Sequence, residues 1–194
     1  MINEQEFIRE LTNKRKQDKA FTKLLDLYQE RLYWHIRKIV GTHENANDVL
    51  QNTFIRVYRS LGNFKQQSSL HTWMYRIAYN ESIRFLESQK KRAYPSMNEV
   101  NDQYIEDLKA DVFFDGDQAQ LLLQRVLQEL PERQRIVFQM KYFDDLKFKE
   151  VASITNIHES TVKTSYYAAV KYIENHITSV DFRQKINELL VNNE

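Results

Sequence analysis

Residues 148–177, "FKEVASITNIHESTVKTSYYAAVKYIENHI", predict two helices joined by a tight turn. The first helix carries Phe148 and Val151 on one apolar face, and Ala152 is small enough to let a second helix approach closely. In the turn, Asn156 can adopt the left-handed backbone conformation. The longer helix has an apolar stripe made by Val162, Tyr166, Ala169, Val170, Ile173 and Ile177. A short helix, a tight turn and a longer helix of this kind form a helix-turn-helix pattern.

In a helix-turn-helix, the face of the longer helix opposite this stripe enters a DNA groove. Its hydroxyl and ammonium groups suit phosphates and base edges. The residues on this face are Thr161, Lys163, Thr164, Tyr167, Ala168 and Lys171. A plain bundle helix with a solvated polar face gives the same pattern and remains an alternative at this point.

The composition of the whole chain favours long helices. Its 194 residues include only three Gly and two Pro, whereas sheet-rich folds need many turns, so we expect an all-α protein. The absence of cysteine excludes disulfides and thiolate metal sites. No apolar run has the length of a signal peptide or a membrane span, so we expect no membrane insertion and a cytoplasmic location.

Charge is distributed unevenly along the chain. Residues 1–92 carry 17 Lys and Arg against 10 Asp and Glu, residues 93–124 carry 1 against 7, and residues 125–194 carry 10 against 10. This pattern predicts two modules with different partners and a flexible acidic linker between them. The expected organisation is a helical bundle over 1–92, a linker over 93–118, a helix-turn-helix domain of four helices over 119–178, and a tail over 179–194.

The N-terminal module shows three helical patterns. The first runs over residues 20–40 and ends at Gly41, and the second has Asn45 or Asn47 as its N-cap and ends at Gly62. The third, which contains "HTWMYRIAYNESIRF" at residues 71–85, can be a buried aromatic helix or a surface on which bases stack. Its predicted core face comprises Leu70, Trp73 or Met74, Ile77, Ala78 and Phe85, and its predicted water-facing stripes comprise His71, Thr72, Tyr75, Arg76, Tyr79, Asn80 and Arg84.

Three blocks of the chain, in order, resemble the extracytoplasmic-function (group IV) sigma factors of bacterial RNA polymerase. They are "DVLQNTFIRVYRSLGNF" at 48–64, "SSLHTWMYRIAYN" at 68–80 and "LPERQRIVFQMKYFDDLKFKEVASITNIHESTVK" at 130–163. The resemblance covers nearly all of residues 20–178. It implies that the bundle is sigma domain 2, which binds core polymerase and melts promoter DNA, and that the helix-turn-helix domain is sigma domain 4.

The resemblance also implies roles for individual residues. Asp48, Gln51 and Asn52 would bind core polymerase, although the family usually has an acid where Asn52 stands. The loop from Phe64 to Leu70 would capture a flipped base. The implied strand-binding residues are Phe64, Lys65, Gln66, Gln67, Ser68, Tyr75, Arg76, Tyr79, Asn80 and Arg84. The implied distal-promoter residues are Ser160, Thr161, Lys163, Thr164, Tyr167 and Lys171.

This chain departs from the family pattern in two DNA-binding segments. Gln66 and Gln67 stand where the family often has Gly followed by an acid, so the preferred base can differ. Ser165, Ala168 and Val170 stand where the recognition helix is commonly Arg-rich, so we expect weak autonomous binding to the distal element.

A physical argument supports the role of the aromatic helix. Separating strands costs a few kcal/mol per unstacked step, and a protein that melts DNA without ATP must recover this by binding the single strand. Stacking on an aromatic side chain gives roughly 1–3 kcal/mol per base. We expect Tyr75, Arg76, Tyr79, Asn80 and Arg84 to contact the strand, and Trp73 and Ile77 to lie in the core.

Other kinds of chemistry have little support in the sequence. The five histidines show no metal-binding spacing, and no phosphate loop, nucleophile elbow or dinucleotide motif is present. We therefore expect no cofactor, no metal and no enzymatic activity. The expected partners are core RNA polymerase, promoter DNA and an anti-sigma factor. The alternatives are a helix-turn-helix regulator that dimerises through its N-terminal bundle, and a helical enzyme such as a nuclease, which would need a carboxylate metal site.

Overall fold

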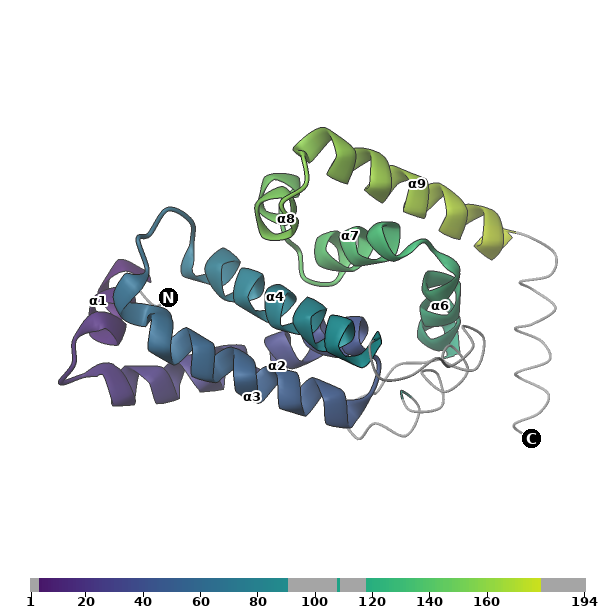
Figure 1. The fold of residues 1–194 in the computed structure, drawn as a ribbon. Helices are drawn as coiled ribbons and strands as arrows, with labels where there is room; N and C mark the ends of the chain where they lie inside the picture. Colours follow the sequence, from purple (N-terminus) through teal and green to yellow (C-terminus); the bar gives the residue numbers. More distant parts are fainter. Residues whose placement is uncertain (1–3, 91–107, 109–117, 179–194) are drawn as a thin grey trace. The chain divides into compact units, whose positions relative to one another are not determined.

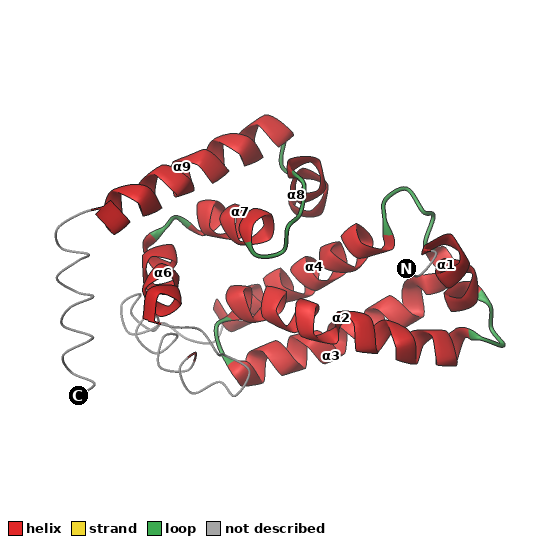
Figure 2. Ribbon diagram, turned by 180° about the vertical axis from the view of Figure 1, so that it is seen from behind, coloured by secondary structure: helices red, strands yellow, loops and turns green. Residues whose placement is uncertain are grey.

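The structure is a computed structural model that describes residues 4–90, 108 and 118–178. All the elements in these ranges are helices, which confirms the predicted all-α class (Figures 1 and 2). They belong to two compact units, one containing α1 to α4 and the other containing α6, α7 and α9. The predicted acidic linker and C-terminal tail lie outside the described residues, apart from Leu108 and Gln118.

The first unit is a bundle of three long helices with a short helix packed against it. α2, α3 and α4 pack pairwise, and α1 packs against α2 and the 3-10 helix η1. Leu24, Ile36, Val57 and Met74 are completely buried at the centre of this bundle. Its elements are α1 (Glu4–Thr12), α2 (Gln17–Val40), α3 (His43–Ser60), η1 (Leu61–Asn63) and α4 (Leu70–Lys90).

The junction between α2 and α3 is a sharp turn. Gly41 ends α2 with a φ of 90°, a conformation that favours glycine, and its N–H donates to the carbonyl of Arg37 over 3.1 Å. The N-cap of α3 is Thr42, whose hydroxyl accepts a hydrogen bond from the Asn45 N–H over 3.2 Å. The predicted stop at Gly41 is confirmed, whereas Asn45 or Asn47 as the N-cap is wrong, because the helix begins at His43.

The C-terminal part of the chain, residues 118–178, contains four described helices, as predicted, and α8 is divided between the two units at Ser153. Leu127, Leu130, Phe138, Ala169 and Ile173 form the core of this part, with Tyr166 and Val170 packed against them. The elements are α6 (Gln118–Glu129), α7 (Glu132–Tyr142), α8 (Phe148–Thr155) and α9 (Glu159–Thr178).

The turn between α8 and α9 has the geometry that the sequence predicts. Asn156 adopts a left-handed conformation with a φ of 57°. The N–H of Ile157 donates to the carbonyl of Ala152 over 3.2 Å, which closes the end of α8. The ring of Phe148 on α8 contacts that of Tyr166 on α9, with centroids 5.4 Å apart. A short helix, a left-handed turn and a longer helix thus form the helix-turn-helix.

Candidate nucleic-acid interface

Tyr75 on α4 is buried, so its predicted exposure is wrong. Only 2% of its surface is accessible. Its ring lies 4.8 Å from that of His35 on α2 and 4.4 Å from that of His71, measured between centroids. Thr72, also predicted to face water, is buried as well. Since α4 packs against both α2 and α3, a broad arc of the helix is enclosed, and Tyr75 fills the core rather than binding a strand.

The accessible stripe of α4 runs along a different face. Asn80 and Arg84 are exposed, and Trp73 and Ile77 are partly exposed, although both were predicted to be core. These residues recur at steps of three and four, so they share one face of the helix. Arg76 lies partly exposed at the edge of the same face. We call Trp73, Ile77, Asn80 and Arg84 the α4 stripe.

Two arginines share one carboxylate beside the α4 stripe. Arg84 Nη1 lies 2.6 Å from Glu81 Oε1, and Arg56 Nε on α3 lies 2.6 Å from the same oxygen. The Glu81 side chain is largely covered, with 13% of its surface accessible, while both arginine side chains are about half exposed. The group has two positive charges and one negative charge. It retains a net positive charge near Asn80, and a phosphate must compete with Glu81 for Arg84.

The loop that precedes α4 is held at both ends. Phe64 is buried, and its ring lies 4.8 Å from that of Trp73. At the other end Leu70 is 1% exposed. Lys65, Gln66 and Gln67 between them are exposed, and Ser68 is partly exposed. Phe64 was predicted to bind the separated strand. Its side chain is instead buried and packs against the ring of Trp73. The remaining predicted residues of the loop are accessible.

Gln66 has an unusual backbone conformation in this loop. Its φ of 54° lies in the left-handed region, which non-glycine residues adopt infrequently. This is the position at which the sequence departs from the Gly of the resembling family. In this chain the left-handed backbone therefore carries a long side chain, at some conformational cost.

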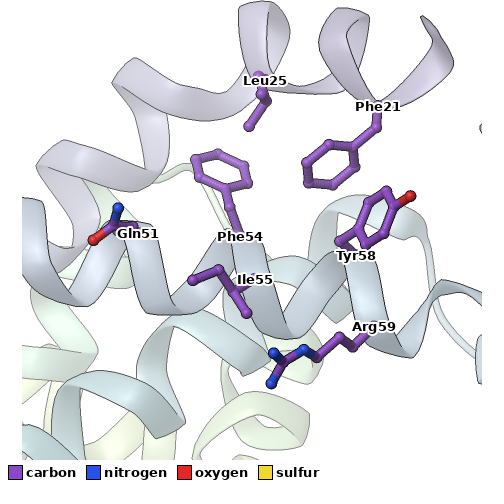
Figure 3. Close-up of a pocket in the computed structure, with 7 residues that line it drawn as sticks. All are labelled: Phe21, Leu25, Gln51, Phe54, Ile55, Tyr58 and Arg59. Carbon is purple, nitrogen blue, oxygen red and sulfur yellow. The ribbon is translucent and has the colours of Figure 1, made fainter. Parts of the chain in front are cut away.

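The three predicted polymerase-binding residues share an exposed face of α3. Asp48, Gln51 and Asn52 are all exposed, at positions i, i+3 and i+4. Beside Gln51 lies an apolar hollow of about 380 Å³ between α2 and α3 (Figure 3). Its lining comprises Phe21, Leu25, Gln51, Phe54, Ile55, Tyr58 and Arg59.

This hollow was not predicted from the sequence, although the position of Ile55 indicates an exposed apolar side chain. Ile55 lies outside the apolar stripe of its helix and is 42% exposed. At the far edge Tyr58 donates a hydrogen bond from its hydroxyl to Asp18 Oδ1 over 2.8 Å. This bond and the charge of Asp18 raise the pKa of Tyr58 above its ordinary value. An apolar surface bordered by the polar side chains of Gln51 and Arg59 is suited to binding another protein.

The recognition face of α9 is as exposed as the sequence predicts. Ser160, Lys163, Thr164, Tyr167, Ala168 and Lys171 are exposed, and Thr161 is partly exposed. The opposite face, represented by Val162 and Ala169, is completely buried.

Electrostatics within α9 modify the predicted phosphate contacts. Lys163 Nζ lies 2.7 Å from Glu159 Oε1 and 5.9 Å from the centre of the Phe148 ring. The hydrogen bond from Lys163, followed by its charge, lowers the pKa of Glu159. Glu159 therefore stays ionised at neutral pH and competes with a DNA phosphate for Lys163.

Neither a metal site nor a membrane helix is found in the described ranges. Within them, no group of three His, Cys, Asp or Glu side chains lies close enough to hold a metal ion. None of the helices described there has both the length and the apolar character that a bilayer crossing requires.

A helix-turn-helix with an exposed recognition face, and a bundle in which Trp73, Asn80 and Arg84 share an accessible face beside an anchored loop, define a DNA-binding protein of two helical modules. Comparison with known proteins identifies the family. Sigma-70 region 2 matches residues 24–92, and Sigma-70 region 4 matches residues 120–173. The ECF RNA polymerase sigma factor SigW of Bacillus subtilis is 30% identical over 154 residues, which are 75% of this chain and 82% of SigW. The chain belongs to the extracytoplasmic-function sigma factors, which bind core RNA polymerase and promoter DNA to initiate transcription.

A second relative agrees with this assignment, and a solved structure has a similar fold. The RNA polymerase sigma-H factor of Pseudomonas aeruginosa is 29% identical over 172 residues, which are 80% of this chain and 85% of that protein. The fold is similar to that of the sigma factor RpoE of Bartonella quintana, solved in complex with the anti-sigma factor NepR. That comparison has a TM-score of 0.63 and 18% identity, and it covers 84% of this chain and 99% of RpoE.

Proposed function

We propose that this sigma factor opens promoter DNA with its first unit and binds the distal promoter element with its second. The observation that carries the proposal is the α4 stripe, which places Trp73, Asn80 and Arg84 on one accessible face. The loop residues Lys65 to Gln67 are exposed just before this helix, and Phe64 joins the two through its contact with Trp73.

The α4 stripe offers the interactions that a separated strand needs. Trp73 presents part of its indole for stacking, worth roughly 1–3 kcal/mol per base. Asn80 presents an amide, which can donate to and accept from a base edge. The cluster of Arg56, Glu81 and Arg84 holds a phosphate through its net positive charge. These contacts offset the unstacking cost of a few kcal/mol per step, so the reaction requires binding only, without covalent chemistry.

Core polymerase binds the first unit through α3 in this proposal. Asp48, Gln51 and Asn52 supply polar contacts, and the apolar hollow that Gln51 borders supplies buried area. Interfaces typically combine an apolar centre with a polar rim in this way. A protein that binds polymerase acts where the polymerase is, so we propose a cytoplasmic location.

The second unit binds the distal element through α9. Lys171 and Lys163 contact phosphates, while Thr161, Thr164 and Tyr167 reach base edges. Since Lys163 must first leave Glu159, this domain binds DNA weakly alone and depends on polymerase to hold it near the promoter.

An anti-sigma factor is a further proposed partner. The similar RpoE structure was solved with one, NepR. An anti-sigma factor that covers the apolar hollow would compete with core polymerase, because Gln51 belongs to both surfaces.

The test is reconstitution with core polymerase. The purified chain should co-elute with the core enzyme and support run-off transcription from promoters that the core enzyme alone does not use. Changing Asp48, Gln51 and Asn52 together to Ala should abolish co-elution while the chain stays folded. The control variant changes Glu87 and Gln89 to Ala. These are exposed residues of similar type at the end of α4, and this variant should co-elute normally. Normal co-elution of the triple variant would refute the assignment of α3.

A further inference from the structure

The N-terminal helix α1 makes a hydrogen bond with the start of α4. The backbone N–H of Leu70 donates to Glu4 Oε1 over 2.8 Å, although the two residues are far apart in the sequence. Leu70 is the first residue of α4, and Ser69 is its N-cap, since the Ser69 hydroxyl accepts from the Thr72 N–H over 3.1 Å. The first N–H groups of a helix have no partner inside it. Glu4 supplies a partner to one of them, and its negative charge suits the positive end of α4.

The carboxylate of Glu4 lies on a helix that is itself firmly packed. Phe7, Ile8 and Leu11 of α1 are buried, and α1 contacts α2 and η1. Burial, followed by the negative charge of Glu4, raises the pKa of Tyr28 on α2. Glu4 therefore lies where α1, α2 and α4 meet.

These contacts place α1 against both ends of the loop before α4. At the first end, η1 packs against α1, and Phe64 follows η1 directly, with its N–H donating to the Leu61 carbonyl over 3.2 Å. At the second end, Glu4 holds Leu70. The exposed residues Lys65, Gln66 and Gln67 lie between the two ends, and Gln66 has the left-handed backbone.

We infer that Glu4 is a positioning residue for base selection: by fixing Leu70, it holds the loop in the shape that presents Gln66 and Gln67 to a base of the separated strand. The inference rests on the proposed function, because it requires this loop to bind the strand. Glu4 itself lies outside the Sigma-70 region 2 match, which begins at residue 24. A loop held at one end only would sample more conformations and discriminate less between bases.

The experiment compares Glu4→Ala and Glu4→Gln with the unchanged chain. Each is assembled with core polymerase and exposed to a pool of single-stranded 12-nucleotide DNA of random sequence, and the bound molecules are sequenced. The readout is the enrichment ratio between the best and second-best base at the most selective position. Glu10→Ala is the matched control, because it removes the same charge from the same helix at a residue that pairs with Lys16 instead.

Glu4→Ala should lower the enrichment ratio about fivefold, the size expected for one hydrogen bond to a charged group at a partly exposed site. Glu4→Gln keeps a carbonyl oxygen as acceptor and should stay within about twofold of the unchanged chain. Co-elution with core polymerase should be unaffected in both variants, and the melting temperature of Glu4→Ala should fall by only a few degrees, so the chain stays folded at the assay temperature. Glu10→Ala should leave the ratio unchanged.

Three results would overturn the inference. The first is an unchanged ratio for Glu4→Ala, and the second is an equal loss for Glu4→Gln. The third is a loss of enrichment in proportion to a loss of folded protein or of co-elution, which would show a general structural role. If the unchanged chain enriches no sequence at all, the proposed strand-binding function fails together with this inference. If only the inference about Glu4 fails, the unchanged chain still enriches particular base sequences.

Discussion

α4 and α9 are both long helices that we propose to bind DNA, but the helices packed against them bury different fractions of their surfaces. Along α9, the recognition face is open, and Tyr167 is 61% exposed. Along α4, two long helices of the bundle cover a broad arc, and Tyr75 is 2% exposed. An aromatic residue on a DNA-binding helix is therefore not by itself a base contact. In α9 the aromatic Tyr167 is exposed, whereas in α4 Trp73, Tyr79 and Phe85 are only partly exposed.

The largest expected difference between the two helices is the loss of folding stability when one aromatic side chain is replaced by Ala. Tyr75→Ala should cost roughly 3–5 kcal/mol, the usual range for truncating a large buried aromatic side chain. Tyr167→Ala should change stability by no more than about 0.5 kcal/mol, because its side chain is mostly exposed. Thermal melts followed by circular dichroism would measure both. Equal melting temperatures for the two variants would contradict the orientation of α4.

The next largest effect is on strand binding. Trp73→Ala should weaken binding of the holoenzyme to single-stranded DNA by roughly 1–3 kcal/mol, through loss of one stacking platform. Tyr167→Ala should leave single-strand binding unchanged and weaken only duplex binding. Fluorescence anisotropy with one labelled DNA of each kind, at one stated salt concentration, separates the two. If Trp73→Ala also leaves single-strand binding unchanged, the α4 stripe is not the strand-binding surface.

A smaller effect distinguishes the cations of the two helices. Lys171→Ala should reduce the slope of log affinity against log salt for duplex DNA by about one, as loss of one phosphate contact does. Arg84→Ala should reduce the corresponding slope for single-stranded DNA by less, because Glu81 already shares its charge. Titrations at several salt concentrations give both slopes. A larger change for Arg84 would show that strand binding displaces Glu81 completely.

The smallest effect concerns the pH dependence of Glu159. Its pKa is lowered in the folded chain, so its pair with Lys163 adds stability above the ordinary carboxyl range and loses it as the pH falls through the lowered pKa. NMR titration of this carboxyl should give a midpoint below the ordinary value, and Lys163→Ala should return the midpoint toward it. A midpoint unaffected by Lys163→Ala would show that another group causes the shift.

The sequence predicts the fold more fully than the site. Helical periodicity, the scarcity of Gly and Pro, and the turn at Asn156 suffice for the all-α class and the helix-turn-helix, because these are local properties of the chain. The exposed face of α9 was predicted for the same reason, since its apolar residues form one narrow stripe.

The orientation of α4 could not be predicted in this way. Its buried arc includes Thr72, Tyr75 and Ser82, whose polarity is typical of a surface, while the partly exposed Trp73 and Ile77 are typical of a core. The Ser82 hydroxyl is satisfied within α4, because it donates to the Ala78 carbonyl one turn earlier, so this polar residue can be buried. Which arc of α4 is enclosed depends on its packing against α2 and α3. The bond from Leu70 to Glu4 likewise joins residues that no local pattern connects.

The central claim is that the α4 stripe stabilises the separated strand, and transcription from two templates tests it most directly. One template is a duplex promoter mapped from transcripts that depend on this protein, and the other is the same promoter with the start region already unpaired. Holoenzyme carrying Trp73→Ala together with Asn80→Ala should lose most run-off transcription on the duplex and recover most of it on the unpaired template. An equal loss on both templates, or no loss on the duplex, would contradict the claim.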